Sequence, residues 1–119
     1  MVKELNNVNS LKNKVSIYVP STIDVYKTVD NTQYVNEVTK ELCLLFGGAT
    51  SQNACGSWYS NDLNKLVTEN VTIVYSYFSD NDYTENNLKK VVSIAKKLCN
   101  DMSQECISLE LNNSLYFID

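Results

Sequence analysis

The chain has 119 residues, of which 44% are hydrophobic and 20% are charged, and its formal net charge at pH 7 is −4. This size and composition predict one folded domain with a real core and exclude a disordered chain. All ten basic residues are lysine. Arginine is the usual residue for bidentate contacts with phosphates and bases, so an acidic, arginine-free chain argues against sequence-specific binding of nucleic acid.

The chain begins with an N-terminal arm and continues as a single domain. Residues 1–13 are polar and rich in asparagine, which is typical of a flexible arm or of one that becomes ordered on a partner. Residues 14–119 form the domain. The first residues lack the apolar core of a signal peptide, and no stretch is apolar enough for a membrane span, so we expect a cytoplasmic protein.

A strand and a helix are predicted first. Residues 14–19 alternate apolar and polar side chains with the period of a strand, and Pro20 ends this strand because proline cannot donate to a ladder. After a long connection over residues 21–30, Asp30 or Asn31 can cap a helix with one apolar stripe. Gly47 and Gly48 end that helix, since glycine readily takes the left-handed conformation of a cap.

A hairpin of two unequal strands follows. Residues 49–60 are polar for a strand and carry Trp58 and Tyr59 near the end. Turn residues at 61–65 lead into residues 66–78, the strongest strand of the chain. Few polar residues remain on either face of this strand, as expected of a central strand.

The last part of the chain predicts a second helix and a terminal hairpin. Residues 85–102 keep the spacing of an amphipathic helix, with four lysines on the outer face, which we read as solvated. Residues 105–111 and 115–118 read as strands joined by the tight-turn pair Asn112-Asn113. The order predicts an α+β fold: a ferredoxin-like βαββαβ sandwich with a C-terminal β-hairpin, and two helices on one face of an antiparallel sheet. The other face would hold aromatic residues such as Tyr18 and needs a cover, most simply a second copy.

From about Cys43 onward, the chain resembles a small bacterial and mobile-element family of unknown function. Members share Gly-x-Trp on one strand, a glutamate shortly after it, and Gln-Glu-Ser-Val leading into the last strand. The matching residues here are Gly56-Ser57-Trp58, Glu69 and Gln104-Glu105-Cys106-Ile107, with cysteine in place of serine and isoleucine in place of valine. The resemblance implies a ferredoxin-like domain and assigns no activity.

The candidate binding site combines these motif residues with a neighbouring aromatic: Trp58, Tyr59, Glu69, Gln104 and Glu105. We expect them at one sheet edge, formed by the polar strand and the segment leading into the last strand, where unpaired backbone groups and two aromatics can anchor a partner. Two carboxylates beside an aromatic ring could also bind a cationic group. The alternative is a tryptophan packed on the sheet edge with both glutamates solvated.

Catalytic, metal and cofactor sites are not expected. The chain has no histidine, which removes the usual general base near neutral pH. Its four cysteines form no CxxC pair, so we expect free thiols and no zinc site. The acidic segment at residues 80–85 lacks the glycine and the final glutamate of a calcium loop, and no glycine-rich phosphate loop is present.

The resulting hypothesis is a small non-enzymatic binding protein that occupies a host protein partner or a small ligand. Abundant asparagine, and lysine without arginine, are what an AT-rich genome encodes, so we expect phage or plasmid origin. An antagonist of a bacterial defence system such as CRISPR, or a sponge for a signalling nucleotide, would fit. The alternative is a cofactor-free small-molecule-binding domain or enzyme of the dimeric α/β-barrel type. Either way we expect a homodimer, with no membrane contact.

Overall fold

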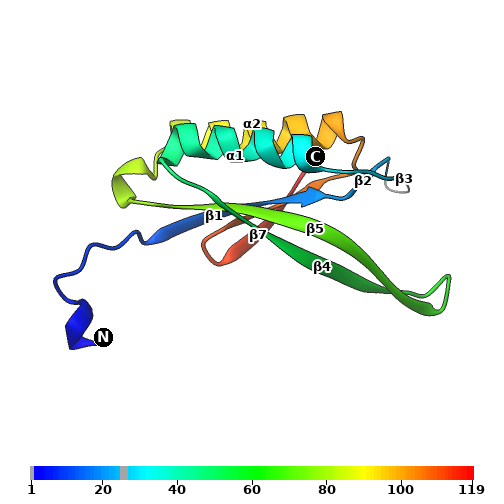
Figure 1. Cartoon of the computed structure of the whole chain (residues 1–119), viewed down its shortest axis with the longest axis horizontal. Helices are drawn as coiled ribbons and strands as arrows, with labels where there is room; N and C mark the ends of the chain where they lie inside the picture. The colour runs from blue at the N-terminus through cyan, green and yellow to red at the C-terminus, as the bar shows by residue number, and fades with distance from the viewer. Residues whose placement is uncertain (1, 25–26) are drawn as a thin grey trace.

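Strand β1 (Asn13–Pro20) is the central strand of the main sheet, between one long and one short antiparallel neighbour. The computed structural model describes residues 2–24 and 27–119 (Figure 1). The main sheet has five strands, in the spatial order β4 (Thr50–Ser60), β5 (Lys65–Phe78), β1, β6 (Ile107–Leu111) and β7 (Ser114–Ile118). All four pairings are antiparallel.

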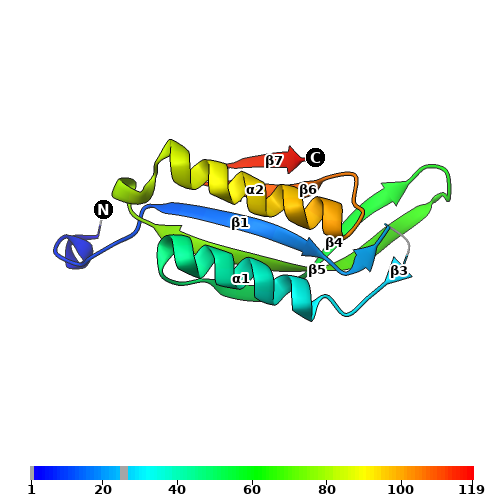
Figure 2. The same cartoon turned by 90° about the horizontal axis from the view of Figure 1, so that it is seen from above.

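Two helices cover the same face of this sheet, α1 (Thr32–Phe46) and α2 (Glu85–Asp101), as Figures 1 and 2 show. The predicted α+β architecture is therefore confirmed, and the strand order is consistent with a ferredoxin-like arrangement to which β7 is added. Helix α2 is capped at its N-terminus by Thr84, whose side chain accepts a hydrogen bond from the backbone N–H of Asn87 at 3.1 Å. Helix α1 ends at Gly47, which has a φ of 91°.

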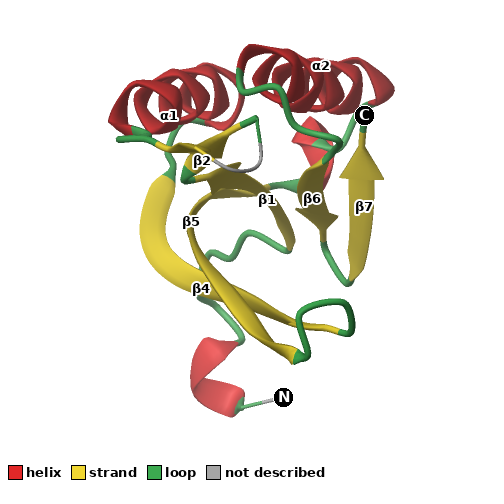
Figure 3. Cartoon of the chain, turned by 90° about the vertical axis from the view of Figure 1, so that its right-hand side faces the viewer, coloured by secondary structure: helices red, strands yellow, loops and turns green. Residues whose placement is uncertain are grey.

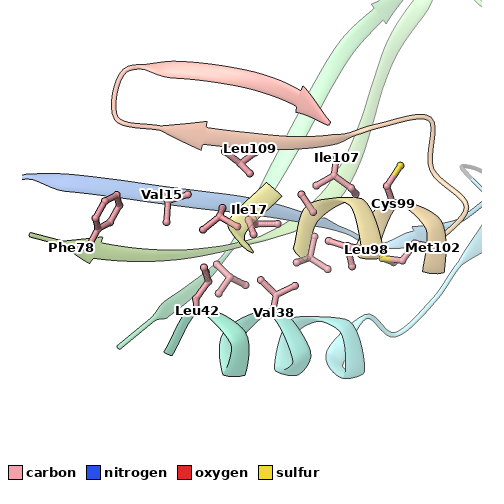
Figure 4. Packing of buried hydrophobic residues seen from close by; sticks show 14 residues of the cluster. Val15, Ile17, Val38, Leu42, Phe78, Leu98, Cys99, Met102, Ile107 and Leu109 are labelled. Atoms are coloured by element: carbon pink, nitrogen blue, oxygen red, sulfur yellow. The ribbon is translucent and has the colours of Figure 1, made fainter. Parts of the chain in front are cut away.

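The core lies between the helices and the sheet (Figure 4). Alternate residues of β1, among them Val15 and Ile17, are fully buried beneath the helices, as the period-two pattern predicts. Helix α1 contributes Val38 and Leu42, and helix α2 contributes a stripe that includes Leu98. The ring of Phe78 stacks on that of Phe46 with 4.5 Å between centroids, which closes one end of the core.

The long connection after β1 contains structure that the sequence pattern misses. It forms a two-stranded sheet of β2 (Thr22–Ile23) and β3 (Lys27–Thr28). The backbone N–H of Asp24 donates to the carbonyl of Met102 at 3.0 Å, which ties this connection to the end of α2. Strands of two residues are too short to show a periodic pattern in the sequence, so β2 and β3 could not be predicted and depend on tertiary contacts of this kind.

Two segments extend away from the sandwich. The β4–β5 hairpin projects beyond the sheet at one end, and the N-terminal arm, with the short 3-10 helix η1 (Lys3–Leu5), leaves the other end (Figure 1). A second 3-10 turn, η2 (Asp80–Asp82), joins β5 to α2. The radius of gyration is 16.0 Å, against about 13–14 Å for a compact domain of this length. Both projections therefore expose surface that a compact sandwich would bury.

The cysteines are free thiols, and they differ in accessibility. Cys55 and Cys106 are exposed, Cys43 is partly buried and Cys99 is buried. Burial raises the pKa of the Cys99 thiol above its ordinary value of 9.0, with smaller contributions from the nearby Cys106 and Asp119. In the part of the chain that the structure describes, no helix is long and apolar enough to cross a membrane.

Candidate functional site

The sheet face opposite the helices carries the candidate site, and we call it the open face. The strand register brings Tyr18 of β1 beside Ile73 of β5, and Glu69 of β5 beside Gly56 of β4, on this face. In Figure 3 the helices lie above the sheet and the open face points down.

A groove of about 410 Å³ crosses the open face, within the range of small-ligand sites. Its floor includes Tyr18 and Ile73, and its walls come from β4 and β5 on one side and from the segment leading into β6 on the other. Small residues explain the hollow: Gly56 lies across from Glu69, and a Cβ added at Gly56 would meet no atom within 4 Å. The lining residues are Tyr18, Pro20, Ala54, Cys55, Gly56, Glu69, Val71, Ile73, Gln104, Cys106, Ile107 and Ser108.

The orientation of the Gln104 amide is fixed by the backbone. Its Nε2 donates to the carbonyl of Thr22 at 2.8 Å and to that of Met102 at 3.1 Å. The Gln104 backbone is held as well, because its N–H donates to the carbonyl of Cys99 at 2.9 Å. With both amide hydrogens engaged, the carbonyl oxygen of the side chain is the group left to accept a hydrogen bond from a ligand.

Tyr18 is held on the floor by a carboxylate. Its hydroxyl donates to Oε1 of Glu110 on β6 at 3.2 Å. Partial burial, and then the charge and hydrogen bond of Glu110, raise the pKa of Tyr18 above its ordinary value of 10.0. The phenol therefore stays neutral near pH 7, and its hydroxyl is held by Glu110, which does not itself line the groove.

The polar lining of the groove combines a carboxylate and an amide. Glu69 brings the carboxylate, and Gln104 brings an amide whose two N–H hydrogens are already engaged with backbone carbonyls. No lysine is among the described residues that line the groove. The nearest lysine on β1, Lys14, lies four residues from Tyr18, about 13 Å along the strand, and its Nζ sits 4.3 Å from the centre of the Tyr75 ring. A positively charged group beside an aromatic ring suits this arrangement.

The structure brings two of the five predicted site residues together. Glu69 and Gln104 line the same groove from opposite sides. Trp58 and Tyr59 lie farther out on the hairpin and are 50% and 56% exposed, and the Tyr59 hydroxyl donates to Asn64 at 2.7 Å. Glu105 is exposed and does not line the groove. Whether these three residues bind a partner or ligand stays a prediction.

The predicted single sheet edge is wrong. Strand β4 is an edge strand, as expected, but β5 and β1 separate it from β6, and β7 covers β6 on its far side. Glu105 precedes β6 and does not lie in it. The two halves of the motif therefore face each other across the open face instead of sharing an edge.

The sequence-based site omitted residues that the fold places in or beside the groove, above all Gly56 and Glu110. Tyr18 could have been included from sequence alone, because the alternation in β1 already predicted that its side chain lies on the open face. Glu110 could not be found in the same way, because its pairing with Tyr18 depends on the register between β1 and β6.

Comparisons with known proteins give a fold but no sequence family. No protein-family model matches the chain, and no curated protein matches it. Among solved structures, it is similar to a phage SAM lyase in complex with S-methyl-5′-thioadenosine, at 17% identity and a TM-score of 0.66, over 96% of this chain and 94% of that one. It is also similar to a phage SAM lyase in the apo state, at 17% identity and a TM-score of 0.63, over 95% and 93% of the two chains.

These likenesses show that the chain shares the fold of a phage enzyme. The expectation of a non-enzymatic protein is therefore corrected, because two solved structures that match nearly the whole chain are of phage SAM lyase, an enzyme. The sequence-based expectation rested on the absence of histidine, which does not by itself exclude catalysis. The phage source of both structures agrees with the predicted phage or plasmid origin.

Proposed function

We propose that this chain is a lyase that acts on SAM or a closely related sulfonium compound in the groove of the open face. The observation that carries the proposal is that Glu69, Gln104 and Tyr18 line one groove, in a fold shared with a phage SAM lyase. The strand order also supports a ferredoxin-like fold as the finer assignment. The resemblance to a motif family fits the same proposal, since Glu69 and Gln104 are two of its motif residues.

The chemistry of a sulfonium matches the groove. The sulfur carries a permanent positive charge, which a carboxylate and an aromatic face stabilise. Glu69 supplies the charge, Tyr18 supplies the ring and the oxygen of Gln104 can accept from the substrate ammonium group. The neutral Tyr18 hydroxyl, held by Glu110, keeps the floor in place.

The proposed reaction breaks the bond between sulfur and the γ-carbon of the amino-acid chain. Sulfur takes both electrons and leaves as the neutral thioether S-methyl-5′-thioadenosine. An oxygen of the substrate's own carboxylate forms the new bond to the γ-carbon, which closes a five-membered lactone, and no proton has to be removed. The absence of a lysine among the described lining residues favours this route, because the substrate carboxylate is left unpaired and free to attack.

A second route would remove a proton from the neighbouring carbon and leave an alkene, with Glu69 as the base. Product analysis separates the two. SAM is incubated with the purified protein, and proton NMR follows the four-carbon product. The lactone, or the free hydroxy amino acid that forms from it by hydrolysis, supports the proposed step, whereas an alkene would assign Glu69 as the base. Intact SAM would reject the lyase proposal altogether.

Self-association remains part of the proposal. The open face exposes aromatic groups, among them Tyr77 and Phe117, and the hairpin exposes Trp58 and Leu66. Large apolar surface of this kind is typical of protein interfaces. A homodimer is the simplest assembly that would cover it.

A further inference from the structure

The N-terminal arm carries a regular apolar stripe that the proposed reaction does not use. Apolar residues recur at every third position, and all are 54–59% exposed. We call them the arm stripe: Val2, Leu5, Val8 and Leu11. The residues between them, such as Asn7, are polar. A period of three is the period of a 3-10 helix, in which side chains three apart lie in one row.

The first part of the arm, residues 2–8, follows that geometry around the 3-10 helix η1. Leu5 N–H donates to the carbonyl of Val2 at 3.1 Å, and Val8 N–H donates to the carbonyl of Leu5 at 3.3 Å, both over three residues. Residues 2–12 are all exposed, so the stripe does not pack on its own domain. Val2, Leu5 and Val8 therefore follow one another along these turns, with Leu11 exposed beyond them, and none of the four is covered by the rest of the described chain.

A receiving surface lies at the far edge of the same sheet. Leu115 and Phe117 of the edge strand β7 point to the open face and are 49% and 67% exposed, and we call this pair the β7 patch. Views along two directions place the arm on the side of the open face, away from the helices (Figures 1 and 3). The stripe and the patch are therefore on the same side of the molecule, and both are uncovered.

We propose that the arm stripe of one copy packs on the β7 patch of a second copy. Burial of two apolar surfaces against each other removes both from water, which is favourable, and each copy of the chain carries both surfaces. Local charge favours the same partner: Lys3 and Lys12 against Glu4 give the arm a net positive charge, whereas Glu110 lies beside Leu115 in the strand register and puts a carboxylate next to the β7 patch. This proposal is independent of the lyase activity.

The test uses two variants that each disable one side. Leu5→Ser with Val8→Ser disables the arm stripe, and Phe117→Ser disables the β7 patch. Deletion of residues 1–11 is a second arm variant. The matched controls are Asn7→Ser, which lies off the stripe, and Tyr116→Ser, which lies on the opposite face of β7 and is 49% exposed. Sedimentation at micromolar concentration measures association, and circular dichroism checks that each variant folds.

Each disabling variant should raise the dissociation constant of self-association by about tenfold or more, as the loss of an apolar anchor does. The controls should associate like the unaltered protein. An equimolar mixture of the arm variant and the patch variant should form a heterodimer, because one supplies an intact patch and the other an intact arm. Unchanged self-association in both variants, a monomeric unaltered protein, or no heterodimer in the mixture would overturn the proposal. None of these readouts depends on SAM, so failure here leaves the lyase proposal standing.

Discussion

The hydroxyl of Tyr18 donates a hydrogen bond to Oε1 of Glu110 at 3.2 Å, which joins the central strand to β6 on the open face. Burial and then Glu110 raise the pKa of this tyrosine above 10.0, so the folded protein holds the phenolic proton more tightly than the unfolded chain does. That contribution to stability is fully present below about pH 10 and is lost as the pH rises further.

Tyr18→Phe should remove this pH-dependent contribution and cost about 1 kcal/mol or less at neutral pH, the usual worth of one partly exposed hydrogen bond. Thermal melting of both proteins between about pH 8 and pH 11 measures it. The unaltered protein should lose more stability than the variant toward the alkaline end. If the melting temperatures of the two proteins changed equally with pH, Tyr18 would have the same pKa in the folded and unfolded chain.

Gly56→Leu should block the groove without harming the fold. The added side chain would enter open space across from Glu69, and no atom lies within 4 Å of its Cβ position. We expect the affinity for SAM or S-methyl-5′-thioadenosine to fall by about tenfold or more, with an unchanged melting temperature. Gly48→Leu is the matched control, because Gly48 is equally unobstructed and lies outside the groove. Equal affinities for both variants would place the ligand elsewhere.

Trp58→Ala distinguishes an anchor on the hairpin from a core residue. The indole is 50% exposed, so we expect its loss to change the free energy of unfolding by about 1 kcal/mol or less. If Trp58 contacts a second copy or the substrate, Trp58→Ala should also weaken that binding by about 2 kcal/mol. Chemical denaturation and titration calorimetry measure the two effects. A large loss of stability with unaltered binding would assign Trp58 to the core.

Leu98→Ala tests the packing of helix α2 on the sheet. Leu98 is 4% exposed, and its truncation should cost about 2–5 kcal/mol of unfolding free energy. Lys97→Ala, one residue earlier, removes an exposed ion pair with Asp101 at 2.6 Å and should cost much less. Chemical denaturation measures both effects. Equal losses of unfolding free energy for the two variants would show that Leu98 does not face the sheet.

Most of the fold could be predicted from sequence because its elements are long enough to show a period. The alternation of Val15, Ile17 and Val19 placed β1 correctly, and the same pattern ordered the faces of β5. The short β2–β3 sheet could not be predicted, since contacts such as Asp24 with Met102 hold it and no local pattern marks it.

The site was predicted in part. Motif positions pointed to Glu69 and Gln104, but sequence distance could not show that they line one groove from the two sides of β1 and do not share a sheet edge. The groove itself depends on small residues such as Gly56, whose role is visible only when the opposite strand is known. The sequence interpretation took the missing histidine as an argument against catalysis, but the sulfonium substrate proposed above would bring its own charge and leaving group and would need no histidine.

The release of S-methyl-5′-thioadenosine from SAM is the most direct test of the proposed function. Chromatography follows the thioether in reactions with the unaltered protein, Glu69→Gln and the control Glu85→Gln, whose carboxylate lies exposed at the start of α2. The unaltered protein and the control should release the thioether at the same rate. Glu69→Gln, which keeps the shape and removes the charge, should be slower by about 100-fold or more. No thioether from the unaltered protein, or equal rates for Glu69→Gln and the control, would contradict the account.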